Sequence, residues 1–373
     1  MYNSKTKIAI VYDWIDKWGG VERVLLHLHR LFPNAHFYTS AVEYKNAQWA
    51  KGLTIHPSFI QSFPSFLRMN RALMAPLFPF AFESFTFGEY DLVISVTSAF
   101  AKGIITKPGT KHICYLLTPP RYLWSHTKDY ISGFKGFFAQ PFLHHLQQWD
   151  LCAAHRPDKY ISISTTTAKR AKQYYQIESQ VVHPPFDTEY WDLQKKTMKK
   201  PGSVSTTDSY YLCVGRMESY KKTQLILEVA KQKQSSHFVF VGTGSLERKL
   251  RQQAPQNCQF AGLVTDSELS YLYSHAKALI MPQNEDFGYI SLESQYHGCP
   301  VIAYQAGGAT ETVIEEETGL FFKDQTVPCL TSQLERFEQI SYNLSHSTGQ
   351  IQQSIRERFG SKRFDAQFLY QLQ

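Results

Sequence analysis

Two runs of alternating strand and helix patterns, separated by one polar stretch, constrain the fold of this chain most strongly. Buried-strand patterns cover residues 7–12, 92–96, 111–116, 160–164 and 180–183 in the first run, and 211–214, 238–241, 278–281 and 301–303 in the second. Helical spacing of apolar residues follows residue 20, and a helix pattern covers 223–233. Such alternation predicts an α/β fold with two Rossmann-like, doubly wound parallel sheets.

The polar stretch indicates where the two domains divide. At roughly 150 residues per domain, 373 residues suit two domains. Residues 192–209 hold almost no core-forming side chains, which is typical of a linker. The prediction is a domain over 1–190, a linker over 191–209 and a second domain over 210–350, with 351–373 as a separate C-terminal segment.

Composition narrows the setting. The six cysteines form no C-x-x-C pair, which favours buried thiols in a reducing compartment over disulfides or a zinc site. The N-terminal apolar run is too short for a signal peptide. The longest apolar-rich stretch, 72–82, is broken by Pro76 and Pro79 and cannot span a bilayer. We expect a cytoplasmic protein, with peripheral binding to the inner face of a membrane as an option.

The charge is unevenly distributed along the chain. The net charge is +7, and residues 1–190 hold 20 Lys and Arg against 13 Asp and Glu. A basic half is compatible with an anionic membrane, a phosphorylated substrate, nucleic acid or a merely solvated surface. Since no nucleic-acid-binding motif is present, we expect no nucleic-acid partner.

Ligands of parallel α/β sheets bind outside the carboxyl ends of the strands, so the loops there are the places to search. These loops are predicted to line a cleft between the two domains, and they cover residues 13–20, 97–103, 117–124, 215–222, 242–245, 282–288 and 305–310.

Two of these loops have features that suit phosphate groups. Gly19 and Gly20 directly precede a helix, where free N–H groups attract phosphate, although a tight turn explains them equally well. Arg216 and Lys221, with Lys222 beside the latter, follow a strand and could hold a diphosphate. A structural salt bridge is the alternative.

The segment around Gly288 carries two carboxylates. Glu285 precedes a helix expected to start at residue 289 or 290, and Glu293 lies about one turn inside it. Carboxylates accept paired hydrogen bonds from vicinal hydroxyls, and a sugar nucleotide has such diols on its sugar and its ribose. The alternative is a surface helix with acidic residues in its first turn.

Blocks along nearly the whole chain resemble retaining glycosyltransferases of the GT-B fold, family four, in their bacterial mannosyltransferase-like branch. The blocks are DWIDKWGGVERVL, YDLVISVTSAFAKG, CYLLTPPRYLWS, WDLCAAHRPDKYISIS, VVHPPFDTEYW, VGRMESYKK, VGTGSLERKL and PQNEDFGYISLESQYHGCPVIAYQAGGATETV. The resemblance implies transfer of mannose from GDP-mannose to a lipid-linked or glycan acceptor, with no metal and no cofactor. It also implies that residues 351–373 pack back on the first domain.

The resemblance assigns roles to single residues. Glu285 would contact the hydroxyls of the donor sugar and Glu293 the ribose. Arg216 and Lys221, or Lys222 in its place, would neutralise the diphosphate. The remaining donor contacts would come from the backbone at Phe287-Gly288 and Gly19-Gly20, and from residues between Phe260 and Val264 beside the base.

Two positions depart from the family pattern. Leu117 and Ser98 stand where relatives usually carry histidines, at least one of them near the reacting sugar. A catalytically weak or non-catalytic nucleotide-sugar-binding protein is therefore the alternative to an active enzyme. Residues 56–87, rich in aromatic side chains, are a candidate membrane-binding surface, with a pair of core helices as the alternative.

Overall fold

The computed structural model describes residues 6–125, 134–205, 209–340 and 347–373. The chain divides into two compact units. Unit 1 consists of Met1–Pro185 and Phe364–Gln373, and unit 2 is Phe186–Arg363. No helix in the described part of the chain has both the length and the apolar character needed to cross a bilayer.

Unit 1 is built on a seven-stranded parallel sheet with the strand order β3-β2-β1-β4-β5-β6-β7. Its strands are β1 (Ile8–Tyr12), β2 (His36–Thr39), β3 (Ile55–Pro57), β4 (Leu92–Thr97), β5 (Lys111–Leu116), β6 (Lys159–Ser162) and β7 (Gln180–Val181). The central strands β1 and β4 are buried along their whole length, because helices cover both faces of the sheet. Ile10 pairs with Phe37 on one side and with Ile94 on the other, which fixes the register at the centre.

The helices of unit 1 are α1 (Gly20–Leu31), η1 (Gln48–Gly52), η2 (Phe59–Ser62), α2 (Ser65–Arg68), α3 (Arg71–Met74), α4 (Phe78–Glu83), η3 (Ala101–Gly103), α5 (Arg121–Trp124), α7 (Phe134–Ala154) and α8 (Thr165–Tyr175). The longer helices, such as α1 and α8, bury part of their surface, whereas the short helix α2 buries no residue. Phe78 and Phe82 of α4 and Leu146 of α7 pack together with Val93 of β4 in one core.

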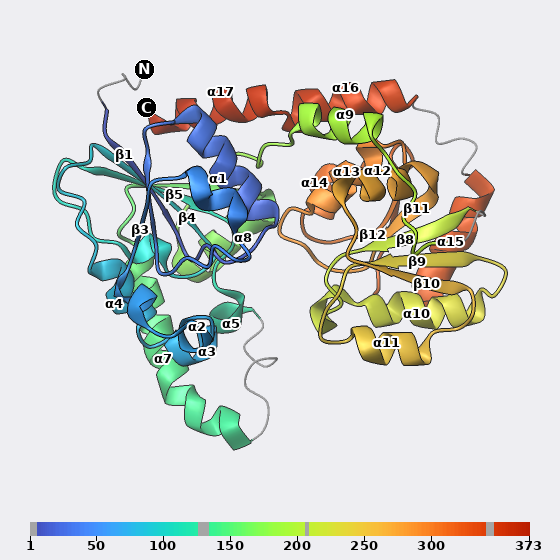
Figure 1. Cartoon of the computed structure of the whole chain (residues 1–373), viewed down its shortest axis with the longest axis horizontal. Helices are drawn as coiled ribbons and strands as arrows, with labels where there is room; N and C mark the ends of the chain where they lie inside the picture. The colour runs from blue at the N-terminus through green and yellow to red at the C-terminus, as the bar shows by residue number, and fades with distance from the viewer. Residues whose placement is uncertain (1–5, 126–133, 206–208, 341–346) are drawn as a thin grey trace. The chain divides into compact units, whose positions relative to one another are not determined.

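Unit 2 has a six-stranded parallel sheet with the order β10-β9-β8-β11-β12-β13. Its strands are β8 (Tyr210–Val214), β9 (His237–Val241), β10 (Cys258–Gly262), β11 (Ala276–Met281), β12 (Val301–Tyr304) and β13 (Gly319–Phe322). Its helices lie on both sides of the sheet (Figure 1) and are α9 (Thr188–Lys196), η4 (Ser219–Lys221), α10 (Thr223–Gln232), α11 (Glu247–Gln253), α12 (Asp266–His275), α13 (Tyr289–Tyr296), α14 (Ala309–Thr312), α15 (Val327–Ile340) and α16 (Thr348–Phe359).

The two doubly wound parallel sheets predicted from the sequence are confirmed. The predicted strand ends agree with the structure to within a few residues. Four strands were not predicted, namely β2, β3, β10 and β13. Each of these strands has at most five residues. Strands β2 and β10 are also only partly buried, so the apolar runs in their sequences are weak.

The predicted linker over 191–209 is wrong in its first part. Residues 188–196 form helix α9, capped by Asp187, whose carboxylate accepts from the backbone N–H of Tyr190 at 3.0 Å. Trp191 is almost fully buried, with its ring edge-on to His297 at 5.3 Å. One large aromatic side chain thus anchors an otherwise polar segment to unit 2. Residues 206–208 of the predicted linker lie outside the described residues.

The predicted C-terminal segment, 351–373, is divided between the two units. Helix α16 belongs to unit 2, and Gln352 of this helix donates to the carbonyl of Tyr296 in α13 at 2.8 Å. Helix α17 (Ser361–Leu372) follows, and residues 364–373 belong to unit 1. There Phe364 and Phe368 pack edge-on against Tyr115 of β5.

Candidate functional site

The strand order identifies one point in each sheet where a ligand site is expected. In unit 2 the chain runs outward from β8 through β9 to β10, and then restarts on the other side of β8 with β11. The loops after β8 and β11 therefore diverge from neighbouring strand ends, which is the switch point where open α/β sheets bind ligands. In unit 1 the corresponding loops follow β1 and β4.

At the switch point of unit 2, the loop after β8 and the loop after β11 are joined by an ion pair. The ammonium of Lys221 contacts Oε1 of Glu285, and both side chains are largely buried. Gln283 donates to the same carboxylate oxygen at 3.2 Å. The neighbouring Lys222 is exposed and has a left-handed backbone with φ of 55°. Of the two lysines considered from the sequence, Lys221 is therefore the one that faces Glu285.

Arg216 lies in the same loop and remains exposed. Its guanidinium donates to the hydroxyl of Tyr220 at 2.5 Å and lies 5.8 Å from the centre of that ring. The loop itself is fixed to the loop after β9, because Met217 N–H donates to the carbonyl of Thr243 at 2.9 Å. Glu218 also accepts from the N–H and hydroxyl of Ser245, and these hydrogen bonds lower the pKa of its carboxyl.

Glycines hold the loop after β11 close to the loop after β12. Gly307 has φ of +64°, and a side-chain carbon there would lie 2.2 Å from the carbonyl oxygen of Glu285. The adjacent Gly308 donates its N–H to that carbonyl at 2.8 Å. Any side chain at Gly307 would both clash and require a left-handed backbone that other residues seldom adopt. This contact fixes the backbone that carries Glu285.

Helix α13 begins at Tyr289, as predicted, with Gly288 at its N-cap and φ of +84°. Phe287 is buried, with its ring edge-on to Phe359 at 5.8 Å, so its backbone rather than its side chain is available to a ligand. The free N–H groups of the first turn of α13 make this helix start suitable for an anion.

Glu293 is not part of a solvated helix surface. Its side chain is 4% exposed, and it accepts a hydrogen bond from the hydroxyl of Tyr273 in α12 at 3.0 Å. A buried carboxylate is costly unless it is hydrogen-bonded, so this glutamate is held in a defined position. The alternative interpretation of the two glutamates as a simple acidic first turn therefore does not hold for Glu293.

The residues predicted to flank a base lie at one side of the sheet of unit 2. Phe260 of β10 is half-buried and stacks on Phe240 with ring centres 4.9 Å apart, while the Arg251 guanidinium lies 5.0 Å from its ring. Val264 follows β10 and is partly exposed beside Leu263, which is 80% exposed.

In unit 1, Gly19 is the N-cap of α1 and Gly20 its first residue, so both lie at a helix start after β1. Beside them, Glu22 is buried and accepts from the hydroxyl of Tyr12 at 3.3 Å. Burial raises the pKa of Glu22. This glutamate was not predicted, because an acidic residue in a first helical turn is common.

Asp13 is the second residue that sequence analysis missed. It is fully buried at the end of β1 and accepts from the hydroxyl of Thr97 and the backbone N–H groups of Ser98, Phe100 and Ala101, each at 2.8 Å. One carboxylate thus organises the whole loop after β4. The signal was present in the sequence as a single acidic residue that ends an apolar strand.

The two positions that depart from the family pattern also lie in unit 1. Leu117 is 6% exposed and serves as a core residue after β5. Ser98 is half-buried, and its hydroxyl lies 3.4 Å from the Asp13 carboxylate. Neither side chain can exchange a proton near neutral pH in the way that a histidine can.

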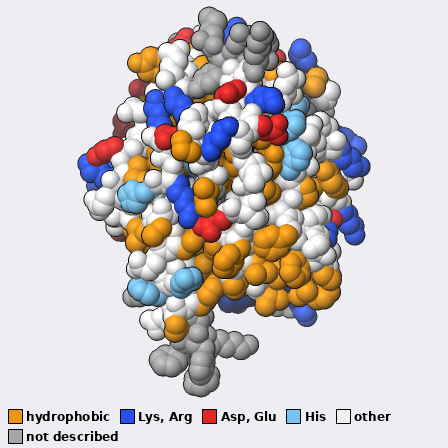
Figure 2. Space-filling model, turned by 90° about the vertical axis from the view of Figure 1, so that its left-hand side faces the viewer, with side chains coloured by type: hydrophobic (Ala, Val, Ile, Leu, Met, Phe, Trp, Pro, Cys, Tyr) orange, Lys and Arg blue, Asp and Glu red, His pale blue; other side chains and the backbone are white. Residues whose placement is uncertain are grey.

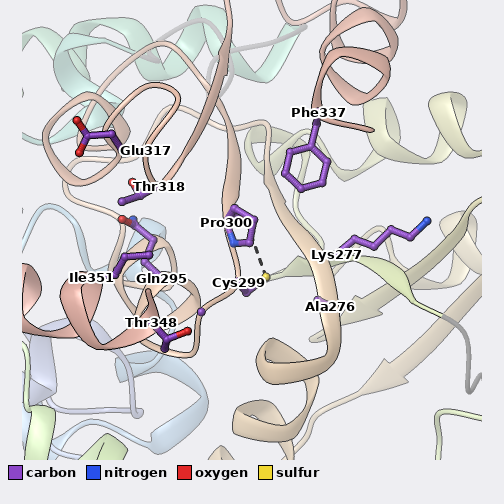
Figure 3. A pocket seen from close by; sticks show the side chains of 11 residues that line it. Ala276, Lys277, Gln295, Cys299, Pro300, Glu317, Thr318, Phe337, Thr348 and Ile351 are labelled. Atoms are coloured by element: carbon purple, nitrogen blue, oxygen red, sulfur yellow. Dashed lines mark hydrogen bonds between the residues drawn. The ribbon is translucent and has the colours of Figure 1, made fainter. Parts of the chain in front are cut away.

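A cavity of about 220 Å³ occupies the opposite end of the unit 2 strands (Figure 3). Ala276, Pro300 and Thr318 of its lining lie at or just before the first residues of β11, β12 and β13. Cys299 also lines it, and burial raises the pKa of this thiol to about 12, so the thiolate is scarce. The cavity is therefore not part of the site at the carboxyl ends of the strands.

Comparison with known proteins separates unit 2 from the rest of the chain. Residues 194–354 match the family model described as glycosyl transferases group 1. The matched residues lie within unit 2 and contain the Lys221–Glu285 ion pair, the start of α13 and Glu293.

Curated relatives match only part of this chain. The O-antigen chain mannosyltransferase C of Escherichia coli is 26% identical over 174 residues, which are 44% of this chain and 45% of that protein. The alpha-1,3/1,6-mannosyltransferase ALG2 of Kluyveromyces lactis is 27% identical over 183 residues, 37% of this chain and 36% of the relative. The chain thus matches less than half the length of each of these relatives.

Solved structures match over nearly the whole chain. The Anabaena protein Alr3699/HepE in complex with UDP superimposes with a TM-score of 0.69 and 17% identity, over 98% of this chain and 99% of that one. Similarity at this level of identity establishes the fold alone. The chain has the GT-B fold predicted from its sequence, and the residues that match the group 1 model lie in its second unit.

Among the described residues, no group of three or more His, Cys, Asp or Glu side chains is arranged to hold a metal ion. The metal-free mechanism that the resemblance implies stays a prediction.

Proposed function

We propose that this chain is a retaining glycosyltransferase that transfers mannose from GDP-mannose to a lipid-linked or glycan acceptor. The observation that carries the proposal is the contact of Lys221 with Glu285 at the switch point of unit 2, within the residues that match the group 1 model. It brings a cation suited to a diphosphate and a carboxylate suited to sugar hydroxyls to the same point. The names of the E. coli and K. lactis relatives support mannose as the sugar.

The proposed donor occupies the carboxyl ends of β8, β11 and β12. Its diphosphate lies at the start of α13 near Gly288, where Lys221 and the exposed Arg216 neutralise its charge. Glu285 accepts from hydroxyls of the transferred sugar, and the buried Glu293 accepts from the ribose. Phe260 and Val264 flank the base.

The proposed chemistry places no proton on a protein group. The bond from the anomeric carbon to the diphosphate oxygen breaks while the acceptor oxygen bonds to the same face of that carbon. The acceptor hydroxyl gives its proton to the leaving diphosphate. Arg216 and Lys221 stabilise the negative charge that develops on that leaving group, which is the main task of the site and requires no metal or cofactor.

A peripheral position on the inner face of a membrane belongs to the same proposal. Residues 56–87 hold two arginines, Arg68 and Arg71, and a single acidic residue, Glu83. Four large apolar side chains of this segment are exposed, namely Phe59, Phe66, Leu73 and Phe80. Hydrophobic side chains gather in the lower half of the face in Figure 2, which is the left-hand side of Figure 1, where unit 1 lies. Apolar side chains within a basic segment suit an anionic lipid surface.

The neighbouring lysines provide the test of the donor site. Binding of GDP-mannose, UDP-glucose, GDP and UDP is measured by thermal shift and calorimetry, and nucleotide release is followed with and without membrane extract. We expect GDP-mannose to stabilise the chain most, and Lys221→Ala to weaken its binding about ten- to a hundredfold. Lys222→Ala is the matched control and should bind as the parent does.

Two results would change the proposal. A preference for UDP-glucose would indicate that the donor is a uridine diphosphate sugar and not GDP-mannose, in line with the UDP complex of the Anabaena protein. Tight binding of GDP-mannose without GDP release under any acceptor condition would favour the second candidate, a non-catalytic nucleotide-sugar-binding protein. The replacement of both family histidines by Leu117 and Ser98 is the observation that favours it.

A further inference from the structure

An exposed indole next to the glycine pair of unit 1 has no role in the proposed donor site. Trp18 directly precedes Gly19, and 45% of it is exposed to solvent. Its ring meets that of Trp49 edge-to-face, with centres 6.2 Å apart. Large aromatic surface is usually buried, so a half-exposed tryptophan beside a proposed substrate loop requires an explanation.

The structure holds this indole pair firmly. Trp49 lies in η1 and donates its indole N–H to the carbonyl of Lys17 at 2.7 Å. The loop before Trp18 is also held to the chain after β2. The N–H of Ile15 donates to the carbonyl of Ala41 at 3.0 Å, and the carbonyl of Ile15 accepts from the N–H of Glu43 at 2.8 Å. The Trp18 ring is therefore a preorganised surface rather than a side chain on a loose loop.

Polar groups lie in the same loop. Asp16 accepts from the guanidinium of Arg71 at 2.5 Å through Oδ2, while its Oδ1 is enclosed and meets no donor among the described residues. The Arg71 guanidinium also lies 4.0 Å above the ring of Trp14. The Arg71 side chain is 39% exposed, so its guanidinium can donate a further hydrogen bond to a hydroxyl group that approaches from solvent.

The location suits the second substrate rather than the donor. Trp18 and Trp49 lie in the chain segments that follow β1 and β2, at the carboxyl edge of the unit 1 sheet. Arg71 links this loop to α3, the helix that presents the exposed Leu73. A sugar held at Trp18 would thus sit beside the surface proposed to meet lipid.

We propose that Trp18, Trp49 and Arg71 form a subsite for a pyranose unit of the acceptor. The inference rests on the proposed function and specifies the acceptor as one that presents a sugar ring. A pyranose offers an apolar C–H face that stacks on an indole and hydroxyls that accept hydrogen bonds from a guanidinium, and this combination matches the three side chains.

The test uses the full chain labelled with ¹⁵N at its tryptophan indoles. Methyl α-mannopyranoside and methyl β-glucopyranoside are the probes, and mannitol is the control that has hydroxyls but no ring face. We expect a pyranoside to shift the Trp18 and Trp49 indole resonances while mannitol does not. Trp18→Ala should weaken pyranoside binding at least about tenfold, and Trp18→Phe should retain most of it because a ring face remains.

Controls separate this inference from the donor proposal. Tyr370→Ala removes an aromatic side chain that is 70% exposed on α17 and should leave pyranoside binding unchanged. Calorimetry with GDP-mannose on the same samples reports the donor site independently. Pyranoside binding that depends on Trp18 supports the subsite even if GDP-mannose does not bind. Unaltered binding in Trp18→Ala, equal shifts with mannitol, or no shift with either pyranoside overturns it, even where GDP-mannose binds.

Discussion

At the residue scale, the two glutamates of the segment around Gly288 have the same charge and different surroundings. Glu285 contacts Lys221 and stays at the edge of the loop, whereas Glu293 is buried against Tyr273. A carboxylate that is paired with a lysine ammonium, as Glu285 is, can exchange that partner for a group of the ligand when the ligand binds. A buried carboxylate that a tyrosine holds in place, as Glu293 is, keeps its position, and the ligand has to place its hydrogen-bond donor beside it.

The first prediction concerns Glu285→Gln. If Glu285 holds the reacting sugar, turnover with GDP-mannose should fall about ten- to a hundredfold, while the affinity for GDP changes little. Steady-state kinetics and calorimetry with GDP measure the two effects. Glu335→Gln, at an exposed position of α15, is the control. Equal losses in turnover and GDP affinity would assign Glu285 to the diphosphate instead.

The second prediction concerns Glu293→Gln. If Glu293 holds the ribose, GDP itself should bind about ten- to a hundredfold more weakly, because an amide replaces an acceptor-only group. Tyr273→Phe should produce a smaller loss of the same kind by releasing the carboxylate from its hydrogen bond. Unchanged GDP affinity in Glu293→Gln would reduce this glutamate to a structural role in α13.

The third prediction concerns pH and His297 at the end of α13. Burial, with a smaller effect of Lys195 opposed by Asp192, lowers the pKa of this histidine to about 4. Its ring bonds Ser270 at 2.6 Å and the carbonyl of Glu293 at 2.7 Å. Between pH of about 6.5 and about 4 the unfolded chain binds a proton at this site that the folded chain does not. The free energy of unfolding should therefore fall as the pH falls through this window.

The shift in the pKa bounds the size of this effect at about 3–4 kcal/mol. Urea unfolding at several pH values measures it for the parent and for His297→Asn, whose dependence on pH should be shallower. His275→Asn, at an exposed position, is the control and should follow the parent. Identical slopes for parent and His297→Asn would exclude His297 as the source.

At the element scale, α17 shows how a helix far along the chain completes unit 1. Lys111 and Lys159 donate from the sheet to the last carbonyls of this helix, those of Leu372, at 2.5 Å, and Gln371, at 2.7 Å. His27 of α1 meets Asp365 at 2.6 Å. Cations at the carboxyl end of a helix complement its dipole, so these contacts add to the apolar packing.

The fourth prediction follows from that packing. Phe368 is fully buried and stacks on Phe364 with ring centres 5.0 Å apart. Phe368→Ala should lower the free energy of unfolding by about 3–5 kcal/mol, because it removes a large side chain and leaves a cavity. Tyr370→Ala on the exposed side of the same helix should change it by less than about 0.5 kcal/mol. Equal effects in urea unfolding would contradict the docking of α17 on unit 1.

At the scale of the whole molecule, the fifth prediction tests membrane binding. Phe66 and Phe80 are 76% and 63% exposed in the segment 56–87, whose single acidic residue is Glu83. We expect the chain to sediment with phosphatidylglycerol vesicles more than with phosphatidylcholine vesicles. Replacing both phenylalanines by Asp should reduce binding about tenfold or more, since apolar contact is lost and the added charges repel the lipid. Tyr370→Asp is the matched control and should bind as the parent does. Equal, negligible binding of the parent to both kinds of vesicle would contradict the proposal that this segment binds a membrane.

The sequence by itself determined the fold class, and it predicted the loops in which the proposed donor site lies. Long apolar strands such as 92–97 and the glycines at helix starts encode local structure, because burial and backbone freedom act over a few residues. The start of α13 at Tyr289 was predictable for this reason, since Gly288 and the apolar run after it are contiguous. Short strands such as β3 escaped prediction because their stability comes from neighbours in the sheet.

Only the tertiary structure decided which side chains meet. The choice of Lys221 over Lys222 depends on the left-handed backbone of Lys222 and on Glu285, which lies 64 residues further along the chain. The burial of Glu293, the anchoring of α9 through Trp191 and the use of Asp13 to organise the loop after β4 also depend on distant partners. Spacing along a chain shows which residues are close in sequence, but it does not show which side chains meet in the folded protein. The environment of a charge is set by whatever the fold packs around it, and burial and hydrogen bonding decide its role.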